Sequence, residues 1–317
     1  MVKKKIIVII GSTASGKTGI AVETGLKYNG EVVSADSRQV YTGMDIGTGK
    51  DLREYDIETS NGLVHIPYHL IDVANPRDQF TLADFQKQAY TAIDNILDRN
   101  KLPIIAGGTG MYAQALVDGY DLSSVKPDND GRDILEQKDR IELFKILSKY
   151  NKKFADNLNN SDKNNKRRLV RYIEMAKIQD SDLKIDKVDK SINSKYDFLI
   201  IGLKWPREVL HSRIHKRLIE RLEKEGMVEE VEDLHRDGVP WKKLEAFGLE
   251  YRFISRYLQD MLTYDEMVDE LHRAIKKFAK QQKKWYKRWE KQGTKINWFE
   301  GETDELWKLI DSFLEKK

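Results

Sequence analysis

Residues 11–18 read GSTASGKT and directly follow the run KKKIIVII, residues 3–10. The apolar part of that run has the length and the β-branched content of a buried strand. The loop has the spacing of a phosphate-binding loop, in which backbone N–H groups converge on phosphate oxygens, Lys17 adds positive charge and the Thr18 hydroxyl reaches Mg²⁺. A helical pattern follows, so a helix N-terminus also faces the anion. The stretch therefore predicts a strand–loop–helix unit that binds phosphate.

The loop alone leaves two ligands open: the γ-phosphate of a nucleotide such as ATP, or a pyrophosphate group that is displaced from another molecule. Both ligands would use the same backbone amides and the same lysine. We expect Mg²⁺ as the cofactor, with Thr18 as its protein ligand. The predicted phosphate-binding residues are Gly11, Ser12, Thr13, Ala14, Ser15, Gly16, Lys17 and Thr18.

Strand-like apolar runs alternate with helical patterns along much of the chain. The runs are residues 6–10, 31–35, 102–106 and 198–203, with a weaker fifth around 68–73. This alternation predicts an α/β fold, a P-loop NTPase-like parallel sheet flanked by helices, with ligands at the carboxyl ends of the strands. Between residues 120 and 196 there are few strand signals, and charged helical segments and Asn-rich turns take their place. We predict a catalytic core at residues 1–119 and 197–317, and a mainly helical insertion at residues 120–196.

The composition excludes several classes of protein. The 317-residue chain has no cysteine, so disulfides and thiolate metal sites are ruled out, and its six histidines show no zinc-site spacing. The formal charge is only +3, from 55 basic and 52 acidic residues, so any nucleic-acid-binding surface must be local. The apolar run before Gly11 is too short for a signal peptide or a membrane span. We expect a cytoplasmic monomer with no membrane attachment.

Two polar stretches follow predicted strands at the same edge as the phosphate-binding loop. In SADSRQVY, Asp36 either caps a turn or acts in the site, as a metal ligand or as a general base toward a nucleophile. In GGTG, Thr109 either belongs to a tight turn or donates a hydrogen bond to a leaving oxygen. The position of both stretches beside the loop favours the functional roles. Ser37, Arg38 and Gln39 would line the same cleft.

The segment 273–291 is strongly basic, with nine Lys or Arg residues and one acidic residue, Glu290. At about 100° per residue, the cations fall within about 140° of arc, opposite an apolar stripe. The stripe comprises Leu271, Ala274, Ile275, Phe278, Trp285 and Trp289. We expect these aromatic residues in the core and the cationic face on a nucleic-acid backbone, the usual alternative being a solvated surface. A second basic cluster, Lys166, Arg167, Arg168 and Arg171, lies in the insertion, and two separated clusters suggest a folded nucleic acid.

Seven stretches together resemble the tRNA dimethylallyltransferase family, in the same order along nearly the whole chain. They are GSTASGKT, SADSRQVYTGMDIGTGK, YHLIDV, FTLADFQ, LPIIAGGTGMY, NKRRLVRYIE and FAKQQKKWYKRW. Ordinary P-loop kinases share only the first. The resemblance implies transfer of a dimethylallyl group from dimethylallyl diphosphate, with Mg²⁺, to the exocyclic amine of the adenosine immediately 3′ of a tRNA anticodon. The phosphate-binding loop would then hold the leaving pyrophosphate.

The resemblance also implies roles for individual residues. Asp36 would be the general base, Thr109 the donor to the oxygen that bridges the allyl group and the diphosphate, and Arg217 a diphosphate clamp beside Lys17. The spacing from Arg217 to Gly226 is one residue longer than is usual in the family, so Arg213 or Arg221 could take its place. Proline is usual where Ser12 stands, and Gln281 and Lys284 stand where arginine and threonine are common. The predicted tRNA-binding residues are Asp36, Ser37, Arg38, Gln39, Arg167, Arg168, Arg171, Lys276, Lys280, Lys283 and Lys287.

Three other functions compete with this interpretation. A small-molecule kinase would use ATP at the same loop. An isopentenyltransferase acting on free adenine nucleotides would not need two basic clusters. A catalytically silent RNA-binding module is disfavoured because Lys17, Thr18, Asp36 and Thr109 are all present.

Overall fold

The computed structural model of the chain describes residues 3–120, 129–178 and 195–315. The chain forms two compact units: Met1–Gly119 together with Lys190–Lys317, and Tyr120–Asp189. The first unit contains the β-sheets, and the described part of the second consists of helices. Each unit has its own hydrophobic core.

Six parallel strands form the main sheet of the first unit, in the order β5-β2-β6-β1-β7-β8. The strands are β1 Lys4–Gly11, β2 Gly30–Ser34, β5 Tyr68–His69, β6 Leu102–Gly107, β7 Tyr196–Leu203 and β8 Asn297–Phe299. The predicted strands and the parallel sheet are confirmed. β5 is shorter than expected, because Leu70 and Asp72 adopt positive φ angles of 63° and 56° and end the strand.

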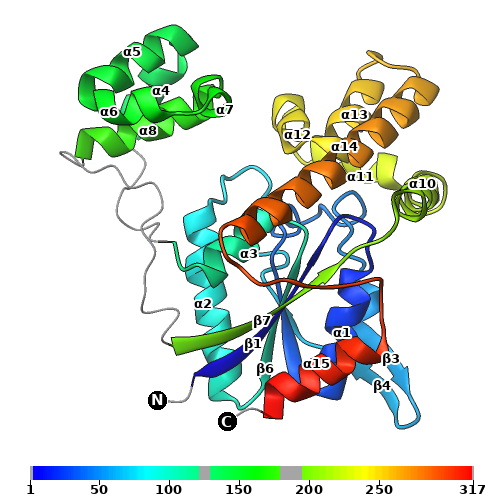
Figure 1. Cartoon of the computed structure of the whole chain (residues 1–317). Coiled ribbons are helices and arrows are strands. Elements are labelled where there is room, and N and C mark those ends of the chain that lie inside the picture. Colours follow the sequence, from blue (N-terminus) through cyan, green and yellow to red (C-terminus); the bar gives the residue numbers. More distant parts are fainter. Residues whose placement is uncertain (1–2, 121–128, 179–194, 316–317) are drawn as a thin grey trace. The chain divides into compact units, whose positions relative to one another are not determined.

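Helices cover both faces of this sheet because β1, with Ile6 to Ile10 fully buried, is apolar on both sides (Figure 1). Helices α2 (Leu82–Asp98) and α3 (Gly110–Val117) pack on one face together with the C-terminal end of α14. Helices α1 (Lys17–Lys27) and α15 (Asp304–Glu315) pack on the other. The carboxyl ends of β1, β2 and β6, where the predicted site residues lie, therefore meet at one edge.

A second core lies among the helices near that edge. These helices are α10 Arg207–Glu223, α11 Met227–Arg236, α12 Trp241–Phe247, α13 Leu249–Leu258 and α14 Tyr264–Lys291. Val40, Tyr41 and Met44, from the segment after β2, are buried in this core. The segment that carries Asp36 is thus anchored to the helices rather than left as a free loop.

Three short elements had no prediction. They are the 3₁₀ turn η1 Leu52–Tyr55, the hairpin of β3 Asp56–Thr59 with β4 Gly62–His65, and strand β8. The hairpin turn is formed by Ser60 and Asn61, and Gly62, the first residue of β4, adopts a φ of 109° that favours glycine. β8 has only three residues, too few for a periodic pattern.

The second unit is helical in its described part, as expected. Its helices are α4 Asn129–Glu136, α5 Arg140–Tyr150, α6 Lys152–Asn157, α7 Asn160–Lys163 and α8 Lys166–Ile178. Leu143 and Leu147 of α5 pack against Leu169 and Ile173 of α8 in a separate small core. Among the described helices of the chain, none combines the length and the apolar character needed to cross a membrane.

Candidate active site

The predicted phosphate-binding loop is formed. Ala14 and Gly16 adopt left-handed φ angles of 59° and 88°, and α1 begins immediately afterwards at Lys17. The Lys17 ammonium donates a hydrogen bond to the carbonyl oxygen of Ser12 at 2.8 Å, across the mouth of the loop. Left-handed residues of this kind curve the loop so that its backbone N–H groups point toward one centre. The first turn of α1 adds N–H groups that have no partner within the helix. The loop therefore has the geometry of an anion site.

Asp36 and Thr109 lie at the neighbouring strand ends, close to Lys17. The amide of Ser37 donates to Thr109 Oγ1 at 3.0 Å, which joins the segment after β2 to the turn after β6. A Cβ atom at Gly108 would be 3.5 Å from Asp36 Oδ2 and 3.8 Å from Lys17 Nζ. The structure thus brings the carboxylate, the ammonium and the hydroxyl together around Gly108.

The electrostatics of the loop lysine reflect this arrangement. Loss of solvent lowers the pKa of Lys17 to about 8, while the Asp36 carboxylate partly restores it and the Arg217 guanidinium lowers it further. A desolvated ammonium next to a carboxylate and a second cation is poised to meet an anionic ligand. Binding of a diphosphate would favour its charged form.

Helix α14 connects the two halves of the site, a role that sequence analysis did not predict. Gln282 accepts a hydrogen bond from the Thr13 amide at 2.8 Å and donates one to the Gly108 carbonyl at 2.8 Å. The Tyr286 hydroxyl is 3.2 Å from the Gly108 carbonyl oxygen. Both side chains are buried. They fix the distance between the phosphate-binding loop and the turn that carries Thr109.

We expect Gln282→Ala to lower kcat/KM for dimethylallyl diphosphate by about 30-fold, because two hydrogen bonds that set the loop position would be lost, each contributing about 1 kcal/mol. Steady-state kinetics with dimethylallyl diphosphate would measure the change in KM and kcat. Gln281→Ala is the matched control, since Gln281 is exposed on the same helix. Equal kinetic constants for the two variants would contradict the role of Gln282.

The buried side of α14 agrees with the expected stripe at Leu271, Ile275 and Trp289 and differs from it elsewhere. Its buried residues are Met267, Leu271, Ile275, Ala279, Gln282, Tyr286 and Trp289. Phe278 and Trp285 are only half-buried, and Trp285 packs against the core of the main sheet, so the prediction of core positions is wrong for Phe278 and holds in part for Trp285. Packing against the phosphate-binding loop places Gln282 and Tyr286 inward, because their polar groups reach backbone atoms that need partners.

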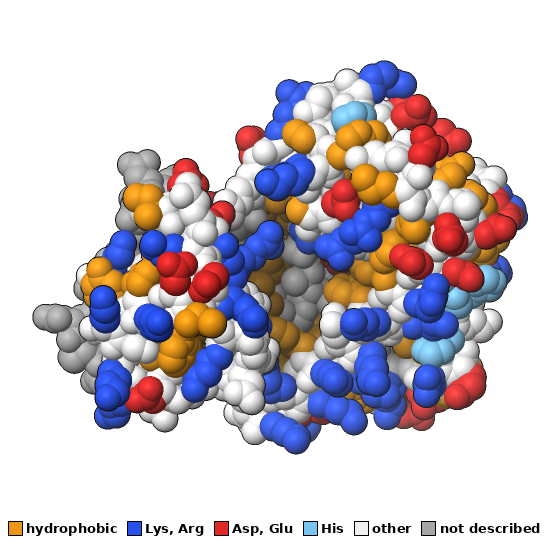
Figure 2. Space-filling model, turned by 90° about the horizontal axis from the view of Figure 1, so that it is seen from above, with side chains coloured by type: hydrophobic (Ala, Val, Ile, Leu, Met, Phe, Trp, Pro, Cys, Tyr) orange, Lys and Arg blue, Asp and Glu red, His pale blue; other side chains and the backbone are white. Residues whose placement is uncertain are grey.

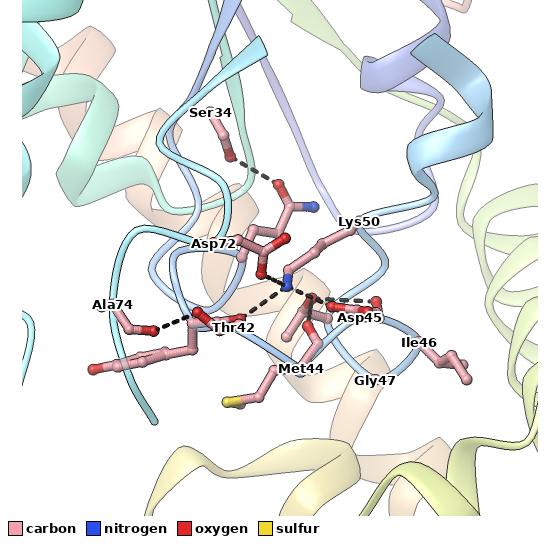
Figure 3. Close-up of polar contacts among 12 residues, drawn as sticks. Ser34, Thr42, Met44, Asp45, Ile46, Gly47, Lys50, Asp72 and Ala74 are labelled. Atoms are coloured by element: carbon pink, nitrogen blue, oxygen red, sulfur yellow. Dashed lines mark hydrogen bonds and ion pairs between the residues drawn. The ribbon is translucent and has the colours of Figure 1, made fainter. Parts of the chain in front are cut away.

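The segment after β2 is held in place by a buried lysine (Figure 3). Lys50 donates to Asp45 Oδ1 at 2.6 Å, to the Tyr41 carbonyl at 2.8 Å and to the Asp72 carboxylate. Its side chain has no exposed surface. Glu230 of α11 accepts from the amides of Ile46 and Gly47 at 2.6 and 3.0 Å. These contacts make the segment a rigid support for Asp36.

Lys50→Met should therefore lower the free energy of unfolding by roughly 1–3 kcal/mol, the usual cost of leaving buried polar partners unsatisfied. Urea unfolding of the purified protein would measure it. Lys204→Met, at an exposed lysine, is the matched control. A midpoint for Lys50→Met that equals that of the control would show that Lys50 does not hold the segment.

Three arginines of α10 lie along the site. Arg213 Nε donates to the Ala14 carbonyl at 2.8 Å, directly on the phosphate-binding loop. Arg217 and Arg221 both pair with Asp51, at 2.8 and 3.0 Å. Desolvation, followed by the charge of Arg221, lowers the pKa of Arg217. Arg213 is thus bound to the loop itself, whereas Arg217 and Arg221 pair with Asp51, and all three stay candidates for the diphosphate clamp.

The remaining predicted tRNA-binding residues are distributed over both units. Gln39 is engaged internally: its Oε1 accepts from Ser34 at 2.8 Å and its Nε2 donates to Gly49 at 2.9 Å. In the second unit Arg168 pairs with Asp162, and Arg171 with Glu174 at 3.3 Å. Arg167 is exposed, and the described residues give it no carboxylate partner. Lys and Arg side chains gather in groups on the face seen in Figure 2.

The donor groups present fit a magnesium ion that is held mainly by a ligand. The described residues contain no group of three or more His, Cys, Asp or Glu side chains that could hold a metal alone. Mg²⁺ commonly keeps several waters and binds through one or two protein oxygens and substrate phosphates. Thr18, in the first turn of α1, and Asp36 offer oxygens of that kind.

The sequence of the chain is similar to those of known proteins over most of its length. The model of the family described as IPP transferase matches residues 39–289. A tRNA dimethylallyltransferase 2 of Treponema denticola is 44% identical over 297 residues, which cover 93% of this chain and 96% of that protein. A tRNA dimethylallyltransferase 1 of Geotalea uraniireducens is 42% identical over 301 residues, covering 95% and 94%.

Solved structures agree with these relatives. The full-length tRNA isopentenylpyrophosphate transferase of Bacillus halodurans has a TM-score of 0.67 and 33% identity, covering 98% of this chain and 96% of that one. A eukaryotic dimethylallyltransferase solved while acting on tRNA has a TM-score of 0.70 and 26% identity, covering 89% and 70%. Similarity therefore extends over both the sequence and the fold.

Proposed function

The chain belongs to the IPP transferase family, whose relatives are tRNA dimethylallyltransferases, and we propose that it transfers a dimethylallyl group from dimethylallyl diphosphate to tRNA. The acceptor is the exocyclic amine of the adenosine immediately 3′ of the anticodon, and pyrophosphate is released. Residues 11–18 then hold the diphosphate of the prenyl donor, in place of the γ-phosphate of a nucleotide. A small-molecule kinase is not favoured.

One observation carries the assignment of roles: the Asp36 carboxylate and the Lys17 ammonium both lie within 4 Å of the point that a side chain at Gly108 would occupy. A prenyl donor with its diphosphate on Lys17 would present its allylic carbon toward Asp36. The amine nitrogen attacks that carbon, the carbon–oxygen bond breaks, and pyrophosphate leaves with the bonding electrons. Asp36 accepts the proton that the amine loses.

Leaving-group stabilisation is the task of the remaining polar groups. The loop amides and Lys17 bind the diphosphate oxygens, and Arg213 or Arg217 adds a second cation. The Thr109 hydroxyl accepts from the Ser37 amide and donates to Ser37 Oγ at 3.3 Å, and it would turn its hydrogen from Ser37 to the bridging oxygen when the donor binds. Mg²⁺, bound through the diphosphate with Thr18 as protein ligand, would neutralise further charge.

The tRNA is expected to meet basic residues of both units, Arg167 to Arg171 in the second and the cationic face of α14 in the first. Because each neutralised phosphate releases counterions, its binding should weaken steeply as salt rises. We place the reaction in the cytoplasm and expect the chain to act as a monomer.

Product analysis tests this function. The protein would be incubated with dimethylallyl diphosphate, Mg²⁺ and either unmodified tRNA or AMP, and the product nucleosides would be identified by mass. We expect a dimethylallyl group on one adenosine of the tRNA, stoichiometric pyrophosphate, and no modified AMP. Prenylation of AMP alone would replace the proposal with a free-nucleotide isopentenyltransferase, and consumption of ATP with a phosphorylated product would replace it with a kinase.

A further inference from the structure

A second concave site lies outside the group of Lys17, Asp36 and Thr109. It is a cavity of about 750 Å³, within the range of small-molecule sites. One wall is the C-terminal half of α14, and the other is the end of β7 with the first turns of α10. Ser12 and Ser15 form part of its lining, so it adjoins the phosphate-binding loop.

The cavity is lined by cations that lack partners. Five are lysines of α14 between residues 276 and 287, and Lys204 and Arg207 belong to the opposite wall. In the part of the chain that the structure describes, none of these seven forms a salt bridge. Glu290, also in the lining, accepts a hydrogen bond from Trp298 at 2.8 Å. Mutual repulsion of so many like charges is best relieved by a bound polyanion.

The pKa of His211, which lines the same cavity, reflects this positive potential. Loss of solvent lowers the pKa of His211, and the charges of Arg207 and Lys276 lower it further, against a smaller effect of Glu208. The field is therefore strong enough to disfavour an additional cation there. An anionic ligand would experience the opposite effect.

Aromatic side chains supply the apolar part of the cavity. Trp205 Nε1 donates to the Ser15 carbonyl at 3.0 Å, and Trp298 Nε1 donates to Glu290. Arg213 lies over the Trp205 ring at 5.0 Å, and Tyr286 contacts the Trp298 ring with centroids 6.0 Å apart. The remaining surface of each indole can contact a planar group. A surface that binds only the phosphate backbone of a duplex would need the lysines and no aromatic residues. The aromatic residues therefore indicate a ligand that has both phosphates and a ring.

One buried polar atom also lacks a partner. Ser15 is 2% exposed, and its hydroxyl oxygen has no hydrogen-bond partner among the described residues. Buried hydroxyls are normally paired, and a phosphate oxygen at this position would accept its hydrogen. Cations, aromatic rings and an unpartnered hydroxyl are thus combined in one cavity.

We propose that this cavity binds a nucleotide, separately from the diphosphate site, with the phosphates on the α14 lysines and the base against Trp205 and Trp298. The nucleotide has two conceivable sources: a free nucleoside triphosphate, or a nucleotide of the bound tRNA. Only the second source rests on the proposed tRNA function. The lysines involved include the four that sequence analysis predicted to contact tRNA.

Two matched triple variants test the proposal. Lys280→Gln, Lys283→Gln and Lys287→Gln remove three exposed cations of the cavity. Arg273→Gln, Lys284→Gln and Lys291→Gln remove three exposed cations of the same helix that do not line it. Melting temperatures equal to that of the unaltered protein would establish that both variants are folded.

The first measurement is calorimetric titration with ATP. We expect binding that the cavity variant weakens at least about tenfold, as loss of charge-assisted contacts implies, and that the control variant preserves. Binding should also persist in Lys17→Ala, whose diphosphate site is impaired. Loss of ATP binding in Lys17→Ala would place the nucleotide on residues 11–18, and equal weakening by the two triple variants would indicate unspecific charge attraction; either result overturns a free-nucleotide site.

The second measurement is tRNA affinity against salt concentration. If ATP does not bind, tRNA affinity is compared for the cavity variant and for Trp205→Ala, which removes an aromatic ring of the cavity but no charge. Loss of affinity in both, with a reduced salt dependence only in the cavity variant, would show that the cavity holds a nucleotide of the tRNA, whereas loss in the cavity variant alone would indicate backbone contact and overturn the proposal. If neither ligand distinguishes the cavity variant from the control variant, the proposal is wrong and the lysines are solvated surface. Failure of the proposed function would appear separately, as the absence of prenylated tRNA with the unaltered protein.

Discussion

Asp36→Asn is expected to lower the single-turnover rate of prenyl transfer by about 10² to 10⁴, the usual effect of removing a general base. Asparagine has the same shape as aspartate. Its side-chain oxygen can still accept the hydrogen bond that the Arg38 amide donates to Asp36 Oδ1 at 3.0 Å. The local turn should therefore persist. Asparagine has no basic oxygen to take the amine proton, so the chemical step should carry the loss. Binding of tRNA and of the diphosphate should change little.

Rapid-quench kinetics at saturating concentrations of both substrates would measure that rate. Varying the Mg²⁺ concentration distinguishes a metal ligand from a general base, the two roles that the sequence leaves open for Asp36. A higher Mg²⁺ concentration partly compensates for the loss of a metal ligand but not for the loss of a base. We expect no recovery at high Mg²⁺. An unaltered single-turnover rate would remove Asp36 from the chemistry altogether.

The parts of the fold that the sequence predicts are those with local signals. β1 and the loop after it combine a buried strand pattern with fixed glycine and lysine positions, and β6 with GGTG repeats the strand-to-turn pattern. Parallel strands place such turns at one edge, so the proximity of Asp36 and Thr109 to Lys17 followed from topology alone. The structure confirms this proximity, while the chemical roles stay predictions.

The parts that the sequence does not predict depend on contacts between distant residues. Gln282 meets the amide of Thr13 across 269 positions of sequence, and no local pattern distinguishes it from the exposed Gln281. Helical periodicity predicted the cationic side of α14 and the buried Leu271, Ile275 and Trp289 correctly. It missed Gln282 and Tyr286, because hydrophobicity ranks Phe278 and Trp285 above them. The backbone groups of the phosphate-binding loop offer hydrogen bonds inside the core, so the polar side chains of Gln282 and Tyr286 are buried there in place of the more hydrophobic ones.

Lys50 illustrates a second limit. Sequence analysis assigned Lys50 no role, and the structure buries it against Asp45 and Asp72, where it supports the segment that carries Asp36. Sequence alone does not tell a charge that binds substrate from a charge that holds a loop, since both occur in glycine-rich turns. The distinction comes from burial and from the number of partners.

Lys17→Met is expected to lower kcat/KM for dimethylallyl diphosphate by about 10² to 10³, the usual loss when one preorganised donor to a developing anion is removed. Lys17 meets the diphosphate before and during the reaction, so both binding and transfer should weaken. Methionine preserves most of the volume, and the loop turns at Ala14 and Gly16 do not depend on the ammonium. The variant should therefore remain folded.

The same lysine makes diphosphate affinity depend on pH. Its pKa in the free protein is about 8, and a bound anion favours the ammonium and raises that pKa, so binding is accompanied by proton uptake above pH 8. Affinity for dimethylallyl diphosphate should be nearly constant from pH 7 to 8 and then fall, by up to about tenfold per pH unit, until the pKa of the complex is reached. Calorimetric titration across pH 7 to 10 would measure this, and Lys17→Met should bind weakly with no such fall. If the variant shows the same decline above pH 8, another group titrates and the ammonium of Lys17 is not the cation that meets the diphosphate.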